Sequence, residues 1–202
     1  MRAFPYEHEA TKEILFHPGK PDVFDGDILE IGPGRGDFVL STAGRHPDKK
    51  IVAIELSKRR YFKLARRVDR NDLTNVLLVQ GNARIILPNY FPPETFEKIY
   101  VLFPDPWPKR RHIPQRLMSI DFITLLAERL KTGGSLFFAT DFWSYADWVI
   151  DNIRSVTSLR SLGRPYFTTI DDMDDYGPSF YEQKWRDEGR AIYYMRYEKI
   201  GG

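Results

Sequence analysis

The sequence of 202 residues contains no cysteine and only four scattered histidines. The absence of cysteine excludes disulfide bonds, thiolate metal sites and reactions that depend on a cysteine nucleophile. Four scattered histidines do not predict a zinc site. No apolar run is long enough for a membrane helix, and the opening residues "MRAFPYEHEA" lack the apolar stretch of a signal peptide. We therefore expect a cytoplasmic protein that binds neither a metal nor a membrane.

The charge of the chain is nearly balanced but unevenly distributed. The formal net charge is +2, yet residues 58–70 hold seven bases and one acid, and "KRRH" at 109–112 forms a second basic cluster. Such clusters indicate a polyanionic partner that touches one face of the protein. A solvated helix face is the alternative interpretation of residues 58–70. A monomer and a homodimer are both compatible with this sequence.

Short apolar runs alternate with segments of helical periodicity. The apolar runs span residues 27–32, 50–56, 75–81, 98–103 and 134–141, and the helical segments span 58–70, 115–131 and 141–155. Near-continuous apolar runs of this length are typical of parallel strands covered on both faces. The alternation predicts a doubly wound α/β sheet with a last strand within 191–200. We expect a single domain over residues 1–202, with residues 1–22 as an arm preceding the sheet.

The first apolar run leads into a glycine-rich turn, "EIGPGRGDF" at 30–38. The glycines are Gly32, Gly34 and Gly36, whereas a dinucleotide-binding turn has the spacing G-x-G-x-x-G. Glu30 precedes the turn, and Asp37 begins the next helix at the place that a pyrophosphate would need. These acids favour a cofactor that carries positive charge and no phosphate. S-Adenosylmethionine, with its ammonium and sulfonium groups, meets this requirement better than a nicotinamide cofactor.

Two more polar residues stand where the second and third strands are expected to end. Glu55 follows the glycine turn at the distance typical of a carboxylate that accepts hydrogen bonds from a ribose. Asn82 ends the third strand, where it is placed to contact an adenine. Ordinary turn residues would explain each one singly, but together with the glycine turn they predict an adenosine cofactor at one edge of the sheet.

The segment "VLFPDPWPKRRH" at 101–112 combines an apolar run, an acid, an aromatic ring and a basic tail. Pro104 and Pro106 restrict the backbone around Asp105, so its carboxylate is expected to point in a defined direction. Trp107 offers a ring for stacking on a base, although it could also cap the core. A purely structural turn has no use for the cations that follow and that suit phosphates: Lys109, Arg110, Arg111 and Arg116.

Several motifs of the chain together resemble those of a known family. "EIGPGRGDF", "AIEL", "GNA", "FPDPWPKRRH", "ATDFWSYA" and "YEQKW" occur in the order found in bacterial tRNA (guanine-N7)-methyltransferases, the TrmB family. The resemblance implies a class I S-adenosylmethionine-dependent methyltransferase fold with an antiparallel last strand, and tRNA as the partner. It implies N7-methylguanosine at position 46 of the variable loop as the product.

The resemblance also implies roles for individual residues. Asp105 would be catalytic. The cofactor site would be lined by Glu30, Gly32, Gly34, Glu55, Asn82 and Asp105. The target nucleotide and the RNA would be contacted by Lys109, Arg111, His112, Arg116, Asp141, Ser179, Tyr181 and Glu182. Two departures concern the RNA contacts: "RHIPQR" has Pro114 and Gln115 where the family usually has two bases, and "SFYE" replaces the usual "TxYE".

The chemistry of guanine N7 makes few demands on such a site. N7 carries a lone pair and no proton, so no general base is needed, and positioning is the main task. A carboxylate near the ring would favour the positive charge that the purine gains, and Asp105 and Glu182 are candidates. Methylation of pyrimidine C5 normally needs a cysteine and is excluded. Three alternatives stay open: methylation of an exocyclic amine of an RNA base, a nicotinamide-dependent oxidoreductase, and a non-catalytic RNA-binding module.

Overall fold

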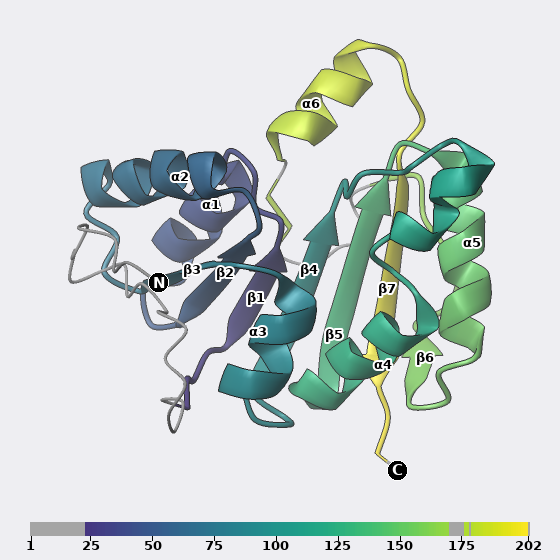
Figure 1. The fold of residues 1–202 in the computed structure, drawn as a ribbon, viewed down its shortest axis with the longest axis horizontal. Helices are drawn as coiled ribbons and strands as arrows, with labels where there is room; N and C mark the ends of the chain where they lie inside the picture. Colours follow the sequence, from purple (N-terminus) through teal and green to yellow (C-terminus); the bar gives the residue numbers. More distant parts are fainter. Residues whose placement is uncertain (1–22, 170–175, 178, 202) are drawn as a thin grey trace.

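The computed structural model describes residues 23–169, 176–177 and 179–201, and these residues form an α/β fold around one sheet (Figure 1). The predicted arm at residues 1–22 lies outside the described residues. The sheet has seven strands in the order β3-β2-β1-β4-β5-β7-β6. The strands are β1 (Ile28–Ile31), β2 (Ile51–Glu55), β3 (Val76–Gln80), β4 (Phe96–Leu102), β5 (Leu130–Thr140), β6 (Leu159–Ser161) and β7 (Tyr193–Lys199).

The sheet is mostly parallel, as the alternating sequence pattern predicts. Strands β1 to β5 pair in parallel with their neighbours. Strand β7 runs antiparallel to both β5 and β6, which confirms the expected antiparallel last strand. The strand order reverses between β1 and β4, and ligands of doubly wound sheets bind outside the carboxyl ends of the strands at that point.

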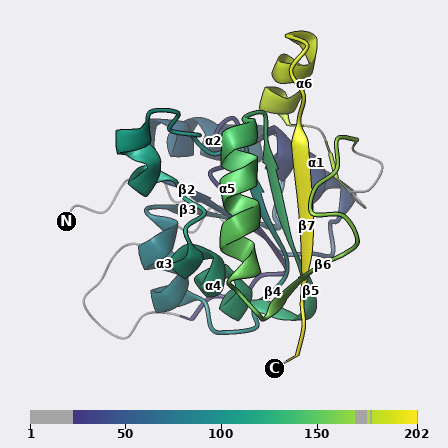
Figure 2. The same cartoon turned by 90° about the vertical axis from the view of Figure 1, so that its right-hand side faces the viewer.

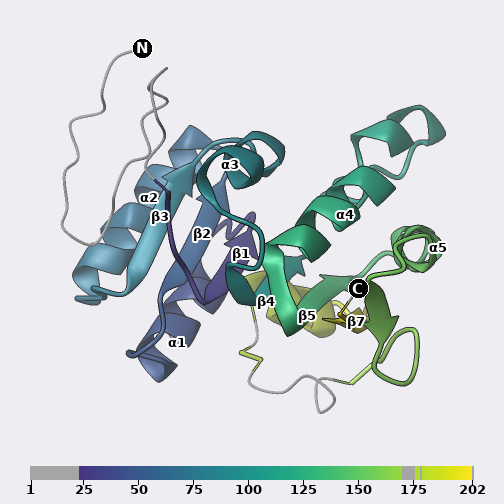
Figure 3. The ribbon, with the colours of Figure 1, turned by 90° about the horizontal axis from the view of Figure 1, so that it is seen from below.

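Helices cover both faces of the sheet (Figures 2 and 3). The helices are α1 (Asp37–Arg45), α2 (Lys58–Arg70), α3 (Ala83–Tyr90), α4 (Ile120–Arg129), α5 (Trp143–Arg154) and α6 (Phe180–Asp187), with a short 3₁₀ helix η1 at Arg110–Gln115. Helices α1 and α2 share a buried cluster with one face of the sheet, and α3, α4 and α5 pack on the other. Helix α6 stands apart at the carboxyl edge of the parallel strands (Figure 1).

Helix α2 has the bounds that its periodicity predicts. Tyr61, Leu64, Ala65 and Val68 form its buried stripe, while the bases occupy the opposite side. Burying such a stripe is what stabilises a surface helix, since propensity alone contributes little. Within the described part of the chain, no helix is both long and apolar enough to cross a membrane.

Two expected boundaries are wrong. The helix expected over 115–131 begins only at Ile120, because η1 occupies Arg110–Gln115 and Pro114 lies inside it. The amide groups of Leu117 and Met118 donate to the Tyr145 hydroxyl at 3.1 and 3.3 Å instead of entering a helix. The expected strand 134–141 begins earlier, at Leu130, and its first residue pairs with Phe96 before a register shift.

Candidate active site

The glycine turn connects β1 to α1 and needs glycine for two different reasons. Gly32, Gly34 and Gly36 have φ values of 74°, 57° and 80°, in the left-handed region that favours glycine. A Cβ on Gly36 would lie 2.1 Å from a methyl carbon of Leu64, so this glycine lets α2 approach the turn. A Cβ on Gly32 would meet no atom within 4 Å. The turn therefore presents bare backbone to open space at the carboxyl end of β1.

Glu30 is a buried acid beneath this turn. Its residue is 3% exposed, and its Oε2 atom has no hydrogen-bond partner among the described residues. Burial first, and then the nearby acids Glu55 and Asp37, raise its pKa to about 8, although it accepts a backbone hydrogen bond from Val39. A buried carboxyl group with a spare oxygen is stabilised by an adjacent cation, so Glu30 fits a positively charged ligand.

Glu55 ends β2 and holds the glycine turn. Its Oε2 accepts from the Gly34 amide at 3.0 Å, and its Oε1 accepts from the Ser57 amide at 2.7 Å and from Arg60 Nε at 3.1 Å. Arg60 was missed by the sequence analysis, because nothing in the helical pattern of α2 indicates that one base reaches back to a strand end. Glu55 is only 1% exposed, and both of its oxygens accept hydrogen bonds from protein groups.

Asn82 is the N-cap of α3, and its Oδ1 accepts from the Arg84 amide at 3.0 Å. This is a common structural role for an asparagine at the start of a helix. The residue is exposed at the carboxyl edge of β3, beside the end of β2 that carries Glu55. The structure thus brings Glu30, Glu55 and Asn82 to neighbouring strand ends.

The "PDPW" turn follows β4 and is strained at both ends. Phe103 and Trp107 have φ values of 51° and 44°, which cost bulky residues free energy and cluster at functional sites. Asp105 lies between them and is exposed. The Trp107 ring meets the His112 ring edge-on at 5.5 Å between centroids. Trp107 thus contacts η1 through His112, and both predictions for its ring, stacking on a base and capping the core, stay predictions.

Arg116 was expected to face RNA, and this expectation is wrong. The residue is only 2% exposed. Its Nε donates to the Pro106 carbonyl at 2.9 Å, and its Nη1 donates to the Ser144 carbonyl at 3.1 Å. The guanidinium also lies 5.0 and 5.4 Å from the ring centres of Tyr145 and Trp148. Arg116 ties the "PDPW" turn to the start of α5, and the positive charge is used internally.

Two of the other predicted RNA-contacting residues, Lys109 and Arg111, are exposed beside the turn. His112 is half-buried and accepts at its Nε2 from Arg111 Nε at 3.2 Å. Asp141 follows β5 and accepts from Arg190 Nη1 at 2.6 Å. Arg190 comes from the segment after α6 and was missed in the sequence; its guanidinium also lies 3.9 Å from the centre of the Trp185 ring.

The "SFYE" segment begins α6. Ser179 is the N-cap, and its Oγ accepts from the Glu182 amide at 3.2 Å; the S-x-x-E spacing of a capping box was the available signal. Tyr181 is exposed, but Glu182 is 1% exposed and was expected to contact the nucleotide. Its Oε1 accepts from the Tyr194 hydroxyl and, at 3.1 Å, from Arg186 Nε. In this arrangement Glu182 anchors α6 to β7 through Oε1, while its buried Oε2 has no hydrogen-bond partner among the described residues.

Among residues 23–169, 176–177 and 179–201, no group of three or more His, Cys, Asp or Glu side chains is placed to hold a metal ion. The available groups are carboxylates beside a glycine turn, a strained acidic turn and surrounding cations. Such an arrangement can bind an organic cation on one side and a polyanion on the other.

Solved structures with similar folds are methyltransferases. The "16S rRNA Methyltranferase KamB" has a TM-score of 0.63 at 14% identity, and the alignment covers 88% of this chain and 89% of that one. The "antibiotic-resistance methyltransferase Kmr" has a TM-score of 0.59 at 16% identity, with 87% of each chain covered. At these identities the likeness shows the fold, which is that of the class I methyltransferases, and confirms the predicted fold class.

Proteins found by sequence comparison have higher identity to this chain than these structures do. The family model Methyltransf_4, described as "Putative methyltransferase", matches residues 25–195. The tRNA (guanine-N(7)-)-methyltransferase of Nitrosomonas europaea is 36% identical over 155 residues, which is 74% of this chain and 69% of the relative. Those of Nitrosomonas eutropha and Thermotoga maritima are 42% and 35% identical over 75% and 86% of this chain.

The chain spans 63% and 54% of the length of these last two relatives. The family model nevertheless matches most of the described fold, from the residues before β1 into β7. The resemblance inferred from "EIGPGRGDF" and "FPDPWPKRRH" is thereby confirmed, and the chain belongs to the tRNA (guanine-N(7)-)-methyltransferase family.

Proposed function

We propose that this chain transfers a methyl group from S-adenosylmethionine to N7 of a guanine in tRNA, at position 46 of the variable loop. One observation carries the proposal beyond family membership. The exposed acid Asp105 sits on a turn with left-handed residues on both sides, at the strand end beside the glycine turn. Strain of this kind persists only where the surrounding structure enforces it. We also propose that the chain acts in the cytoplasm, where it would meet its tRNA substrate.

The glycine turn and its acids support S-adenosylmethionine as the cofactor. The spare oxygen of Glu30 suits its ammonium group, and the open space at Gly32 admits it close to the backbone. Glu55 would accept from the ribose by exchanging its contact with the exposed Arg60 for a hydroxyl group. When bound, S-adenosylmethionine supplies an electrophilic methyl group. A phosphate-bearing dinucleotide would bring negative charge beside Glu30, Glu55 and Asp37, which argues against the oxidoreductase alternative.

The protein's share of the chemistry is positioning and electrostatics. Guanine N7 needs no base because it has no proton to lose, so the site must hold the purine in line with the methyl group. The purine becomes more positive as it accepts the methyl group, and the Asp105 carboxylate stabilises that charge. Asp141, held by Arg190, has a fixed direction in which it can accept hydrogen bonds from a guanine edge.

The direct test is methylation of unmodified tRNA. The full chain is incubated with S-adenosylmethionine and a bulk pool of unmodified tRNA, and the nucleosides are identified by mass spectrometry. We expect 7-methylguanosine, with chemical cleavage of the RNA at the modified base mapping it to position 46. An N-methylated exocyclic amine would support the alternative acceptor, and no methylated nucleoside at all would contradict the proposal.

A further inference from the structure

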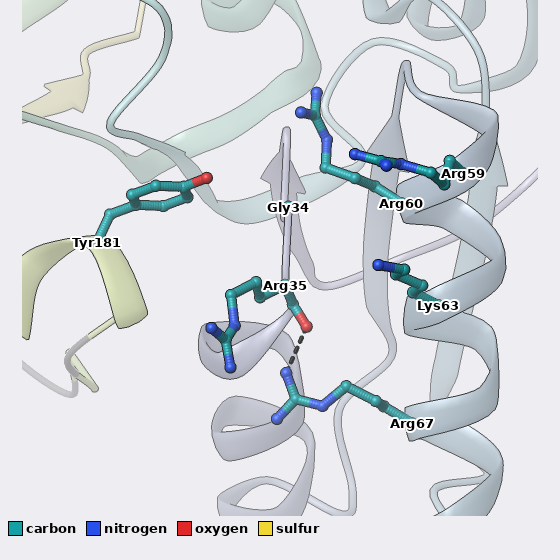
Figure 4. A pocket seen from close by; sticks show the side chains of 7 residues that line it. All are labelled: Gly34, Arg35, Arg59, Arg60, Lys63, Arg67 and Tyr181. Carbon is teal, nitrogen blue, oxygen red and sulfur yellow. Dashed lines mark hydrogen bonds between the residues drawn. The ribbon is translucent and has the colours of Figure 1, made fainter. Parts of the chain in front are cut away.

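A basic cavity of about 440 Å³ opens beside the candidate active site (Figure 4). Gly34 and Arg35 of the glycine turn contribute to its lining. Four bases of α2 line one side, namely Arg59, Arg60, Lys63 and Arg67. Tyr181 of α6 closes the opposite side, with Cε2 3.7 Å from where a Cβ on Gly34 would be. Three segments far apart in the sequence thus build one strongly positive cavity.

Two of these five cations are used to hold the cavity in shape. Arg67 donates to the Arg35 carbonyl, drawn as a dashed line in Figure 4, and pairs with Asp37 at 2.8 Å. Arg60 pairs with Glu55 at 3.1 Å. These contacts fasten α2 at both ends: Arg60 in its first turn holds Glu55 at the end of β2, and Arg67 in its last turn holds the glycine turn and the start of α1.

Two of the remaining three cations have no counter-charge among the described residues. Arg59 and Lys63 are exposed and have no acidic partner in the described part of the chain. They stand four residues apart and therefore on the same face of α2. Arg35 lies above the Phe180 ring at 3.9 Å and is 3.9 Å from Asp37. Like charges gathered without counter-charge are costly unless they serve an anionic ligand.

We propose that this cavity binds a phosphodiester of the RNA backbone close to the target guanine, with Arg59 and Lys63 as the contacting cations. The inference rests on the proposed function and adds a second RNA contact to it, on the other side of the glycine turn from the "PDPW" tail. Sites for single-stranded nucleic acids commonly combine cations that bind phosphates with an aromatic ring that stacks on a base. Tyr181 is the aromatic residue of this cavity. The proposal thus makes two bases of residues 58–70, Arg59 and Lys63, RNA contacts, in line with the first of the two interpretations of this segment.

The test compares two double variants on the same helix. Arg59→Gln with Lys63→Gln removes the unpaired cations of the cavity, whereas Arg66→Gln with Arg70→Gln removes the same charge from exposed positions of α2 outside it. We expect the first pair to weaken binding of an unmodified tRNA transcript about tenfold, and the slope of log affinity against log salt to fall by about 0.7 to 0.9, the contribution of one neutralised phosphate. The second pair should change affinity less than threefold.

Measurements of tRNA affinity and of methylation kinetics distinguish the phosphate site from the proposed methyltransferase activity. With the first pair we expect the KM for tRNA to rise, with kcat at saturating tRNA and the affinity for S-adenosylmethionine unchanged. Equal losses for both pairs would make α2 a diffuse basic face and overturn the cavity as a site. Weaker cofactor binding with unchanged tRNA binding would assign the cavity to the cofactor and also overturn it. If wild type binds tRNA through these residues but forms no 7-methylguanosine, the proposed function fails while the phosphate site stands.

Discussion

Replacing Arg116 by methionine should damage both stability and turnover, and the size of the effect follows from its contacts. The two hydrogen bonds to the carbonyls of Pro106 and Ser144 measure 2.9 and 3.1 Å, in a residue that is 2% exposed. Bonds from a charged group contribute roughly 1.5–3 kcal/mol each, so losing both costs about 3–6 kcal/mol. Methionine keeps apolar contact with Tyr145 and Trp148 but loses the attraction of the guanidinium to the two rings, so the measured loss includes both the bonds and the ring contacts.

The free energy of unfolding translates into a measurable shift. For a domain of this size each kcal/mol moves the Tm by about 2–4 °C, so we expect a drop of about 6–24 °C, measured by calorimetry. Arg116→Lys keeps the charge and can reach one carbonyl, and it should lose about half as much. Both variants are assayed well below their Tm, so that loss of folded protein does not enter the kinetics.

The kinetic prediction distinguishes positioning from RNA contact. Without its anchor at Pro106 the strained turn relaxes and Asp105 shifts, and a misplacement of about 1 Å can cost about 100-fold in rate. We expect kcat to fall by at least tenfold with the KM for tRNA nearly unchanged. If Arg116 acts through Asp105, adding Arg116→Lys to Asp105→Ala should cost little more. A raised KM for tRNA with an unchanged kcat would refute this reasoning and return Arg116 to the RNA surface.

Three further changes test the cofactor side and the reacting side. Burial raises the pKa of Glu30 from 4.5 to about 8, so its contribution to the free energy of unfolding is fully present below about pH 4.5 and is lost as the pH rises through about 8. Glu30→Gln should therefore raise the Tm at pH 9 relative to wild type and leave it nearly unchanged at pH 4.5. The same variant should weaken S-adenosylmethionine binding in a calorimetric titration. Gly36→Ala places a methyl group 2.1 Å from Leu64 at a φ of 80°, so the Tm should fall by several degrees, and an unchanged Tm would contradict the close approach of α2. Asp105→Asn keeps the exposed turn but removes its charge, so kcat should fall by about 100-fold or more with the Tm within about 1 °C; full activity would remove Asp105 from the chemistry.

Much of this protein is determined by local sequence. The apolar runs define the five parallel strands to within a few residues, because a strand covered on both faces must be apolar throughout. The stripe of Tyr61, Leu64, Ala65 and Val68 sets the bounds of α2. The glycine spacing marks the turn, since only glycine adopts φ values near 74° and 80° without strain. The prolines around Asp105 likewise mark an exposed, rigid acid by their own stereochemistry.

Only the tertiary structure decided which charges face outward. Arg116 and Glu182 look in sequence like surface residues of a binding segment, yet each is buried because partners from distant segments satisfy it: Ser144 lies 28 residues from Arg116, and Tyr194 lies 12 residues from Glu182. Burying a charge is tolerated only where such partners are in place, and no local pattern contains them. Arg60 pairs with Glu55, only five residues away, while Arg59 and Lys63 on the same helix have no acidic partner among the described residues. Nothing in the basic pattern of α2 distinguishes these three residues, because the distinction depends on where the end of β2 lies relative to the helix.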